Sequence, residues 1–220
     1  MPQKPELTID ALVQEARTFC ESISRENHAD LAGVTDGKAV GTYVEHRLAA
    51  HLAAKYRMDP GNSALGIDLP GPGVNTDIKV TSIQTPQSSC PFRTAGQKVY
   101  GLGYNLLVIV YKKEDHPGGC RLTITSCTFI EARRTGDYTL TKRLAEMLAD
   151  GAGRDDIMSL LADRGLPGDE ITLGQLADRI LQTPPEQGYL TISNALQWRL
   201  KYQHALGLNG SVSGITNHEW

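Results

Sequence analysis

A carboxylate and an ammonium group stand two residues apart in the segment Asp77–Val80, at Asp77 and Lys79. Side chains in a β-strand alternate between its two faces, so in a strand these two charged groups share one face. A further carboxylate, Asp68, precedes a turn at 70–75 that is rich in proline and glycine. Such a turn predicts a hairpin connection, which folds Asp68 back towards Asp77. The sequence therefore predicts two carboxylates and one lysine at a single point.

Two carboxylates that approach each other closely repel unless one is protonated or a cation lies between them. Mg²⁺ suits this position because hard divalent ions prefer oxygen ligands together with water and phosphate. A third acid, Glu45, lies at the edge of the apolar stripe of a helix predicted over 42–56, where it could point into the domain. Gln97, on a short helix predicted over 92–101, is a further candidate catalytic residue.

Each of these residues also has an ordinary structural explanation. Asp77 and Lys79 could form an ion pair on a solvated strand, and such surface pairs are common and contribute little. Glu45 could be a solvated carboxylate at the edge of its helix, and the Gln97 side chain could bond to the backbone. The occurrence of three acids and a lysine in this order favours a functional site.

The spacing of apolar residues changes along the chain and predicts the helices and strands that must position these residues. Apolar residues at helical spacing predict helices over 8–26 and 42–56. Short strand-like runs flank the turn at 70–75, and the apolar run at 104–111 predicts the central strand of a sheet. The HPGG turn at 116–119 leads into a further strand.

Beyond Asp137 the pattern becomes helical. Helices are predicted over 141–149, 155–164, 173–181 and 194–206. This order of elements predicts an α/β (α+β) fold with a small mixed β-sheet flanked by helices. We expect a core at 1–138, a helical C-terminal region at 139–206 packed on that core, and a flexible tail at 207–220.

The ordered set Glu45, Asp68 and Asp77-Ile78-Lys79 resembles the PD-(D/E)XK nuclease superfamily, and specifically type II restriction endonucleases. The runs GIDLPG, NTDIKVTSIQTPQSSCPF and QKVYGLGYNLLVIVYKK are similar to segments of such enzymes, and the resemblance spans about residues 40–131. One departure concerns Asp68, because the proline follows this acid by two residues and does not directly precede it. The resemblance implies a restriction-endonuclease-like core.

The resemblance also implies Mg²⁺-dependent hydrolysis of phosphodiester bonds in double-stranded DNA, giving 5′-phosphate and 3′-hydroxyl ends. Asp68 and Asp77 would ligate Mg²⁺, with the Ile78 carbonyl as a further ligand. Lys79 would orient or help deprotonate the attacking water, and Glu45 would hold a second metal or a metal-bound water. Metal ions polarise phosphoryl oxygens and lower the pKa of bound water.

Candidate DNA-binding residues lie outside this set. The loop after the catalytic strand carries side chains able to contact base edges: Gln84, Gln87, Ser88 and Ser89. This loop could equally be a plain polar connection. Basic residues suited to phosphate contacts, which position without specifying, are Arg93, Lys98, Arg199 and Lys201.

The composition is that of an ordinary globular chain of 220 residues. A segment of membrane-spanning length and a signal peptide are both missing, so we expect a cytoplasmic protein. The net charge of −3 argues at first against a nucleic-acid partner. However, residues 77–148 hold ten Lys/Arg against six Asp/Glu, a local balance of +4. The four cysteines form no metal-binding pattern and are expected to be reduced.

We expect a homodimer, because cleavage of both strands is most simply achieved by two sites related by a two-fold axis. Neither a membrane nor a nucleotide cofactor is expected. Two alternatives remain open. One is a non-catalytic DNA-binding regulator whose acids are structural, and the other is a structure-specific repair or recombination nuclease.

Overall fold

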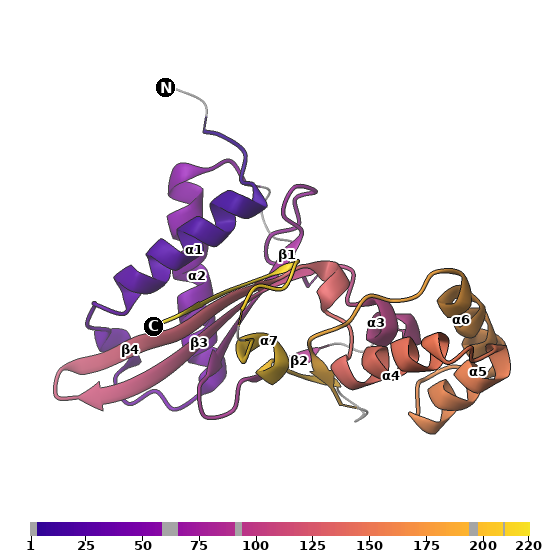
Figure 1. Cartoon of the computed structure of the whole chain (residues 1–220). Coiled ribbons are helices and arrows are strands. Elements are labelled where there is room, and N and C mark those ends of the chain that lie inside the picture. The colour runs from indigo at the N-terminus through magenta and orange to yellow at the C-terminus, as the bar shows by residue number, and fades with distance from the viewer. Residues whose placement is uncertain (1–3, 59–65, 91–93, 194–197, 209) are drawn as a thin grey trace. The chain divides into compact units, whose positions relative to one another are not determined.

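The computed structural model describes residues 4–58, 66–90, 94–193, 198–208 and 210–220. Helices and strands alternate along the chain and form an α/β structure with a small mixed sheet (Figure 1). The predicted fold class is confirmed at this level.

The chain divides into two compact units that do not follow the predicted boundaries. Unit 1 comprises Met1–Pro86, Tyr104–Ile130 and Leu208–Trp220, and unit 2 comprises Gln87–Gly103 and Glu131–Gly207. The expected boundaries at 138/139 and 206/207 do not match these units, because the short segment 87–103 belongs to the helical unit 2. Each unit therefore combines segments that are far apart in sequence, which a division into consecutive stretches could not anticipate.

A four-stranded mixed sheet lies at the centre of unit 1 (Figure 1). Its strands, in spatial order, are β1 (Thr76–Ser82), β3 (Asn105–His116), β4 (Gly119–Ile130) and β7 (Ile215–Glu219). β1 runs parallel to β3, and the other neighbours are antiparallel. The run from Leu106 to Tyr111 in β3 is buried throughout, as predicted for an apolar interior strand.

Two helices pack on this sheet, with α1 (Ile9–Ile23) against β4 and α2 (Gly37–Lys55) against β1. The short 3-10 turn η1 (Ala29–Leu31) lies between them. α2 begins at the N-cap Asp36, whose carboxylate accepts a hydrogen bond from the Lys38 N–H. The buried side chains of α2 recur every four residues, and they are Val40, Val44, Leu48 and Leu52. This narrow stripe fixes which face of α2 is turned to the sheet.

A flexible tail was expected at 207–220, but its described residues from 210 to 220 belong to unit 1 and include a strand. Residues 215–219 form β7, whose Ile215 pairs with Ile130 and whose Glu219 pairs with Ser126 of β4. Ile215 is buried. The correction has a simple cause, because the open edge of β4 supplies backbone hydrogen bonds to a segment with few apolar residues of its own.

Unit 2 contains a three-stranded antiparallel sheet in the order β2 (Gln87–Cys90), β6 (Trp198–Lys201) and β5 (Thr191–Ile192). Its helices are α3 (Ala95–Tyr100), η2 (Ala132–Arg134), α4 (Tyr138–Ala149), α5 (Arg154–Asp163), α6 (Glu170–Gln182) and α7 (Gln203–Leu206). An apolar cluster joins α3 to α6 and includes Val99, Leu144, Leu161 and Ala177. The helices predicted over 141–149, 155–164 and 173–181 are therefore confirmed, apart from shifts at their ends.

The helix predicted over 194–206 is wrong in its described part. Residues 198–201 form β6 and residues 203–206 form the single turn α7, while 194–197 lie outside the described residues. The run Trp198-Arg199-Leu200-Lys201 alternates apolar and basic residues, which is the pattern of a strand. Pairing with β2 selects that alternation.

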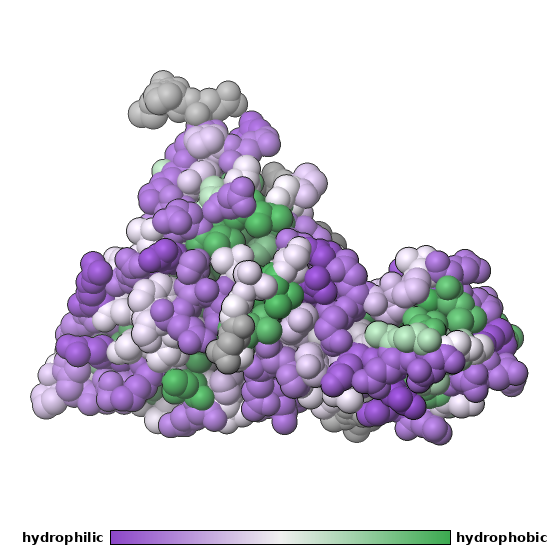
Figure 2. Space-filling view, in the orientation of Figure 1, coloured by the Kyte–Doolittle hydropathy of each residue, from purple (hydrophilic) through white to green (hydrophobic). Residues whose placement is uncertain are grey.

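Figure 2 shows one face of the chain, which is mostly hydrophilic and interrupted by small apolar patches. Among the described residues the large exposed apolar side chains are Ile83, Ile171, Leu181 and Trp220. No helix in the described part of the chain is both long and apolar enough to cross a membrane.

Candidate active site

The strand β1 holds Asp77 and Lys79 on one face, as the alternation predicts. The Lys79 ammonium donates to Asp77 Oδ2 at 2.8 Å, and only 5% of the Asp77 side chain is exposed. The intervening Ile78 faces the other way and is buried in the apolar core of unit 1. The core therefore anchors the strand and holds the charged pair on the opposite face.

Asp68 reaches the same strand through the predicted hairpin. Leu69 and Thr76 exchange two backbone hydrogen bonds of 2.9 Å each, and the turn between them closes on the Gly71 carbonyl. Asp68 Oδ2 then accepts a hydrogen bond from the Ile78 N–H at 2.8 Å. Asp68 also lies close enough to Asp77 to raise the pKa of that carboxyl group. The predicted approach of the two carboxyl groups is confirmed.

Glu45 approaches from α2, one turn after Gly41. A side-chain carbon at Gly41 would lie 3.7 Å from the Val80 carbonyl oxygen and 3.9 Å from Glu45 Oε1. The half-buried Glu45 carboxyl thus lies on the side of α2 that faces β1. Its pKa is raised, first by burial and then by the charge of Asp68, although Lys79 opposes the change.

The electrostatics of the group follow from this crowding. The pKa of Asp77 is raised to about 7, chiefly by burial and also by the neighbouring Asp68, against the pull of Lys79. Burial by itself would lower the pKa of Lys79, but the carboxylates of Asp77, Asp68 and Glu45 outweigh it and raise this pKa. Three carboxyl groups thus face one ammonium, and a proton must be shared or a cation bound.

The donor set fits a hard divalent cation. No three His, Cys, Asp or Glu side chains of the described residues stand ready to hold a metal together. Asp68 and Asp77 nevertheless lie close enough for Asp68 to raise the pKa of Asp77, and Asp68 bonds to the residue next to Asp77. Mg²⁺ commonly uses only one or two carboxylates and completes its shell with water and phosphate oxygens. Asp68 and Asp77 meet that requirement, with Glu45 and the Ile78 carbonyl in the same region.

Gln97 takes part in local hydrogen bonds. It belongs to α3 in unit 2, where its Oε1 accepts from the Thr94 N–H at 3.3 Å and its Nε2 donates to the Leu102 carbonyl at 3.1 Å. Its side chain therefore caps and closes its own helix. The catalytic role expected of Gln97 stays a prediction, and the structure assigns it this capping role within unit 2.

The DNA-binding candidates divide into distinct environments. Gln87 and Ser89 lie on β2 directly opposite Lys201 and Arg199 of β6, so segments more than 100 residues apart in sequence form one surface. Ser88 points to the other face and hydrogen-bonds to the Tyr202 hydroxyl. No sequence pattern indicates this Tyr202 contact, although the alternation in 198–201 could have identified the strand.

The remaining candidates behave differently. Gln84 is exposed in unit 1, in the connection that follows β1. Lys98 is only 5% exposed, so it is not the open phosphate contact expected. It lines a small cavity together with Asp137 and Arg164. Arg93 lies outside the described residues.

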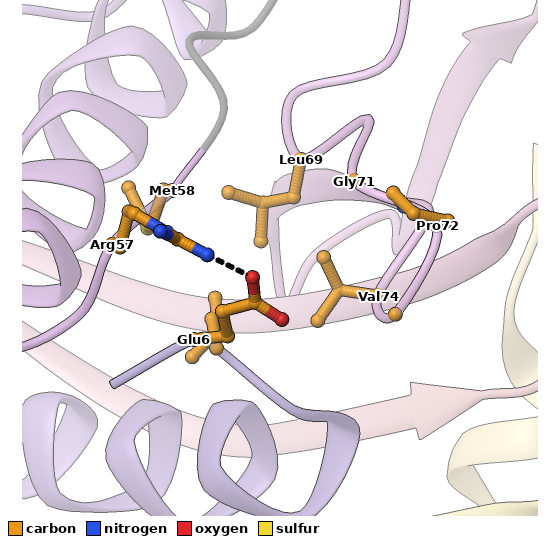
Figure 3. A pocket seen from close by; sticks show the side chains of 9 residues that line it. Glu6, Arg57, Met58, Leu69, Gly71, Pro72 and Val74 are labelled. Carbon is orange, nitrogen blue, oxygen red and sulfur yellow. Dashed lines mark hydrogen bonds and ion pairs between the residues drawn. The ribbon is translucent and has the colours of Figure 1, made fainter. Parts of the chain in front are cut away.

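A separate cavity of about 240 Å³ lies beside the hairpin (Figure 3). Leu69, Pro72 and Val74 line one side, and an ion pair between Glu6 and Arg57 lines the other. Among the described residues that line this cavity Glu6 is the one carboxylate, and it is paired with Arg57, so they hold no acid pair like that on β1.

A family model and a curated protein both match nearly the whole chain. The family model described as type II restriction enzyme NspV matches residues 6–217. The type II restriction enzyme NspV of Nostoc sp. is 48% identical over 211 residues, which cover 95% of this chain and 95% of that protein.

A structural comparison gives a more distant similarity. The crystal structure of the tetrameric restriction endonuclease SfiI bound to cognate DNA aligns with a TM-score of 0.41 and 12% identity. The alignment covers 100% of this chain and 89% of that chain.

Proposed function

This chain belongs to the family of the type II restriction enzyme NspV, and we propose that Asp68, Asp77, Lys79 and Glu45 form its Mg²⁺-dependent catalytic site. The chain is a type II restriction endonuclease, an endodeoxyribonuclease that binds double-stranded DNA. Enzymes of this type generally need a divalent metal ion. The identity of the ion and the residues that hold it are the content of the proposal.

The observation that carries the proposal is the position of Asp77. This carboxyl group is almost fully buried, lies beside the carboxyl group of Asp68 and is paired with Lys79 at 2.8 Å. Burial of an acid beside a second acid is unfavourable for folding alone. Such perturbed groups concentrate at functional sites.

Mg²⁺ is the ion proposed, because the ligands offered are carboxylate and carbonyl oxygens and the substrate brings phosphate oxygens. When bound, the ion would polarise the scissile phosphate and lower the pKa of a nearby water. Asp68 and Asp77 would hold it, and the Ile78 carbonyl is adjacent on the same strand. Asp68 is kept in position by the Ile78 N–H.

Lys79 supplies the positive charge on this face. The surrounding carboxylates raise its pKa, so the ammonium stays charged at neutral pH and can donate hydrogen bonds to the water and to the scissile phosphate. Glu45, whose pKa is raised by burial, is placed to accept a hydrogen bond from water or to help hold a second ion. The expected products carry 5′-phosphate and 3′-hydroxyl ends.

One such set of residues is present per chain, and a duplex has two strands to cut. We therefore propose that the enzyme acts as a homodimer with its two sites related by a two-fold axis. No nucleotide cofactor has a part in this proposal. Sedimentation of the protein at assay concentration should give about twice the chain mass of 23.9 kDa, and a strictly monomeric active species would exclude the dimer.

The test of the proposed function is cleavage of long duplex DNA in Mg²⁺, with an EDTA control. Discrete fragments that appear only with the metal, and cut ends that ligate without prior phosphorylation, are the expected result. A smear or cutting limited to branched DNA would contradict sequence-specific cleavage. Full activity in EDTA would contradict the metal site.

A further inference from the structure

One face of the sheet formed by β2, β6 and β5 is turned away from the interior of unit 2. Ser89 is directly opposite Arg199, and Lys201 lies between Gln87 and Thr191. Directly opposed residues in an antiparallel sheet project to the same side. The polar face of this sheet therefore consists of Gln87, Ser89, Thr191, Arg199 and Lys201.

The opposite face fixes the sheet to unit 2. Leu200 and Ile192 are buried there, and Ser88 bonds to the buried Tyr202. Ser193 and Arg199 are joined by two hydrogen bonds, from the Ser193 N–H to the Arg199 carbonyl at 3.1 Å and from the Arg199 N–H to Ser193 Oγ at 3.0 Å. The polar face is thus presented by a backbone that is well anchored.

The charge on this face is positive and locally uncompensated. Arg199 and Lys201 are exposed, and within the described ranges neither has an ion-pair partner. Arg133 of the same unit, by contrast, is paired with both Glu131 and Glu186. The polar face itself contains no carboxylate. Its charge complements a polyanion, and its amide and hydroxyl groups can donate and accept hydrogen bonds.

The spacing of the face matches the spacing of bases. Neighbouring strands lie about 4.8 Å apart, and side chains two residues apart on one strand lie about 6.8 Å apart. Two base-pair steps cover roughly the same distance along the axis of duplex DNA. A two-stranded β-ribbon fits the major groove, which is about 12 Å wide, and β2 with β6 forms such a ribbon, to which β5 adds only two residues. Arg199 and Lys201 on the middle strand would then project towards the floor of the groove.

We propose that the polar face of the β2–β6–β5 sheet enters the major groove and recognises the target sequence. Arg199 donates two hydrogen bonds to a guanine, and the Gln87 amide contacts an adenine, the pairings that these side chains favour. Lys201, Ser89 and Thr191 make the surrounding contacts. The inference rests on the proposed function, which supplies duplex DNA as the ligand. In sequence, only four residues, 83–86, separate β1, which carries the proposed catalytic residues, from β2 of the recognition face.

The experiment measures recognition without cleavage. The wild-type protein selects duplexes from a random-sequence pool in EDTA, and its affinity is then measured for the selected duplex and for a scrambled duplex of equal length. The variants are Arg199→Lys, Arg199→Ala and Gln87→Ala. Arg143→Lys is the matched control, since this exposed arginine of unit 2 pairs only with Glu146 among the described residues. Far-UV circular dichroism verifies that each variant is folded.

Arg199→Lys keeps the charge and loses the two-pronged donor geometry. We expect it to lower affinity for the selected duplex roughly 5- to 150-fold while leaving the scrambled duplex unchanged. Gln87→Ala should behave similarly, and Arg143→Lys should match the wild type. A wild-type preference in Arg199→Lys, or an equal loss on both duplexes in Arg199→Ala, would overturn base recognition by this face. A wild-type protein that selects no sequence would overturn it as well.

The outcome is separable from the proposed function. Lys79→Met should lose cleavage and keep the preference for the selected duplex. Retained preference with retained cleavage in Lys79→Met would count against the catalytic assignment and leave the polar face unaffected. Cleavage at the original sites by Arg199→Ala would count against the polar face alone.

Discussion

The carboxylate of Asp68 is bound to the strand it serves: its Oδ2 accepts a hydrogen bond from the backbone N–H of Ile78 at 2.8 Å. Ile78 stands between Asp77 and Lys79, so this bond fixes the distance between the hairpin acid and the charged pair on the strand. The buried Ile78 side chain holds the same residue in the core. Packing of one apolar residue thereby positions three charged ones.

Asp68→Asn should separate the structural role of Asp68 from its proposed catalytic role. The amide oxygen can still accept from the Ile78 N–H but carries no negative charge. We expect cleavage to fall at least about 100-fold with little change in stability.

Asp68→Ala should lose cleavage as well and should also lower the free energy of unfolding by about 1–3 kcal/mol, because the Ile78 N–H loses its partner. Urea titration and initial cleavage rates measure the two effects. Cleavage at the wild-type rate by Asp68→Asn would remove this residue from the metal site.

Lys79→Met should abolish cleavage while DNA binding persists. The methionine side chain resembles the lysine stem in length but carries no charge, so Asp77 loses the pairing that favours its ionised form. We expect a loss of roughly 100- to 1,000-fold in the single-turnover rate, since a donor to the scissile phosphate is removed. Lys79→Arg is the matched control for charge. Rates within a few-fold of wild type in Lys79→Met would show that the ammonium has no part in the reaction.

Without metal, the buried Asp77 should make stability depend on pH. Its pKa is about 7 in the folded chain, against an ordinary value of 3.8. Between these values the folded state keeps a proton that the unfolded state has lost, so stability declines as pH rises through this window and levels off above it. In EDTA, the unfolding free energy of Asp77→Asn should therefore gain on that of the wild type by roughly 2–4 kcal/mol between pH 4 and pH 8. Denaturant titrations at both pH values measure this difference.

Mg²⁺ should restore the stability that the wild type loses, relative to Asp77→Asn, at pH 8. A cation that binds the ionised Asp77 stabilises the folded state by mass action, so Mg²⁺ should raise the unfolding midpoint of the wild type at pH 8 and leave Asp77→Asn unchanged. Equal stabilisation of both proteins would place the bound ion elsewhere.

Glu15 provides a prediction that is independent of the active site. This residue of α1 accepts hydrogen bonds from the Lys55 ammonium at 2.6 Å, the His51 ring at 2.7 Å and the Tyr56 hydroxyl at 3.2 Å. The Lys55 hydrogen bond is the main cause of the lowered pKa of Glu15. Its contribution to stability is therefore present above its unfolded pKa and is lost as pH falls through the lowered folded value.

Glu15→Gln should lower the unfolding free energy by about 1–3 kcal/mol at pH 7, with a smaller difference in acid. Sequence preference and cleavage by the folded protein should be unchanged. A difference in stability that grows as the pH is lowered would contradict the assigned role of Glu15.

The arrangement of Asp68, Asp77 and Lys79 was accessible from sequence because its determinants are local. The alternation along β1 and the Pro/Gly turn act over fewer than 15 residues, and a short connection leaves the chain few ways to fold. The apolar run of β3 is equally clear, since it is buried by its own composition. The position of Glu45 was harder to predict from sequence, because only the packing of α2 on β1 turns its carboxyl towards the strand.

The remaining features depend on partners far away in sequence. The strand β6 forms because β2 offers it hydrogen bonds across more than 100 residues, and a helical interpretation of 194–206 could not include that partner. β7 forms on the open edge of β4 for the same reason. The capping role of Gln97 was not evident from sequence, because a glutamine that caps a helix and one that contacts substrate have the same sequence appearance.

The most direct test of the catalytic site compares cleavage and binding by Asp77→Asn. Single-turnover cleavage of an end-labelled duplex in saturating Mg²⁺ gives the chemical rate, and titration of the same duplex in EDTA gives the affinity. Asp77→Asn should cut roughly 1,000-fold more slowly than the wild type, with affinity within a few-fold and Arg143→Lys unchanged in both. A cleavage rate for Asp77→Asn within tenfold of the wild type would contradict the proposed catalytic site on β1.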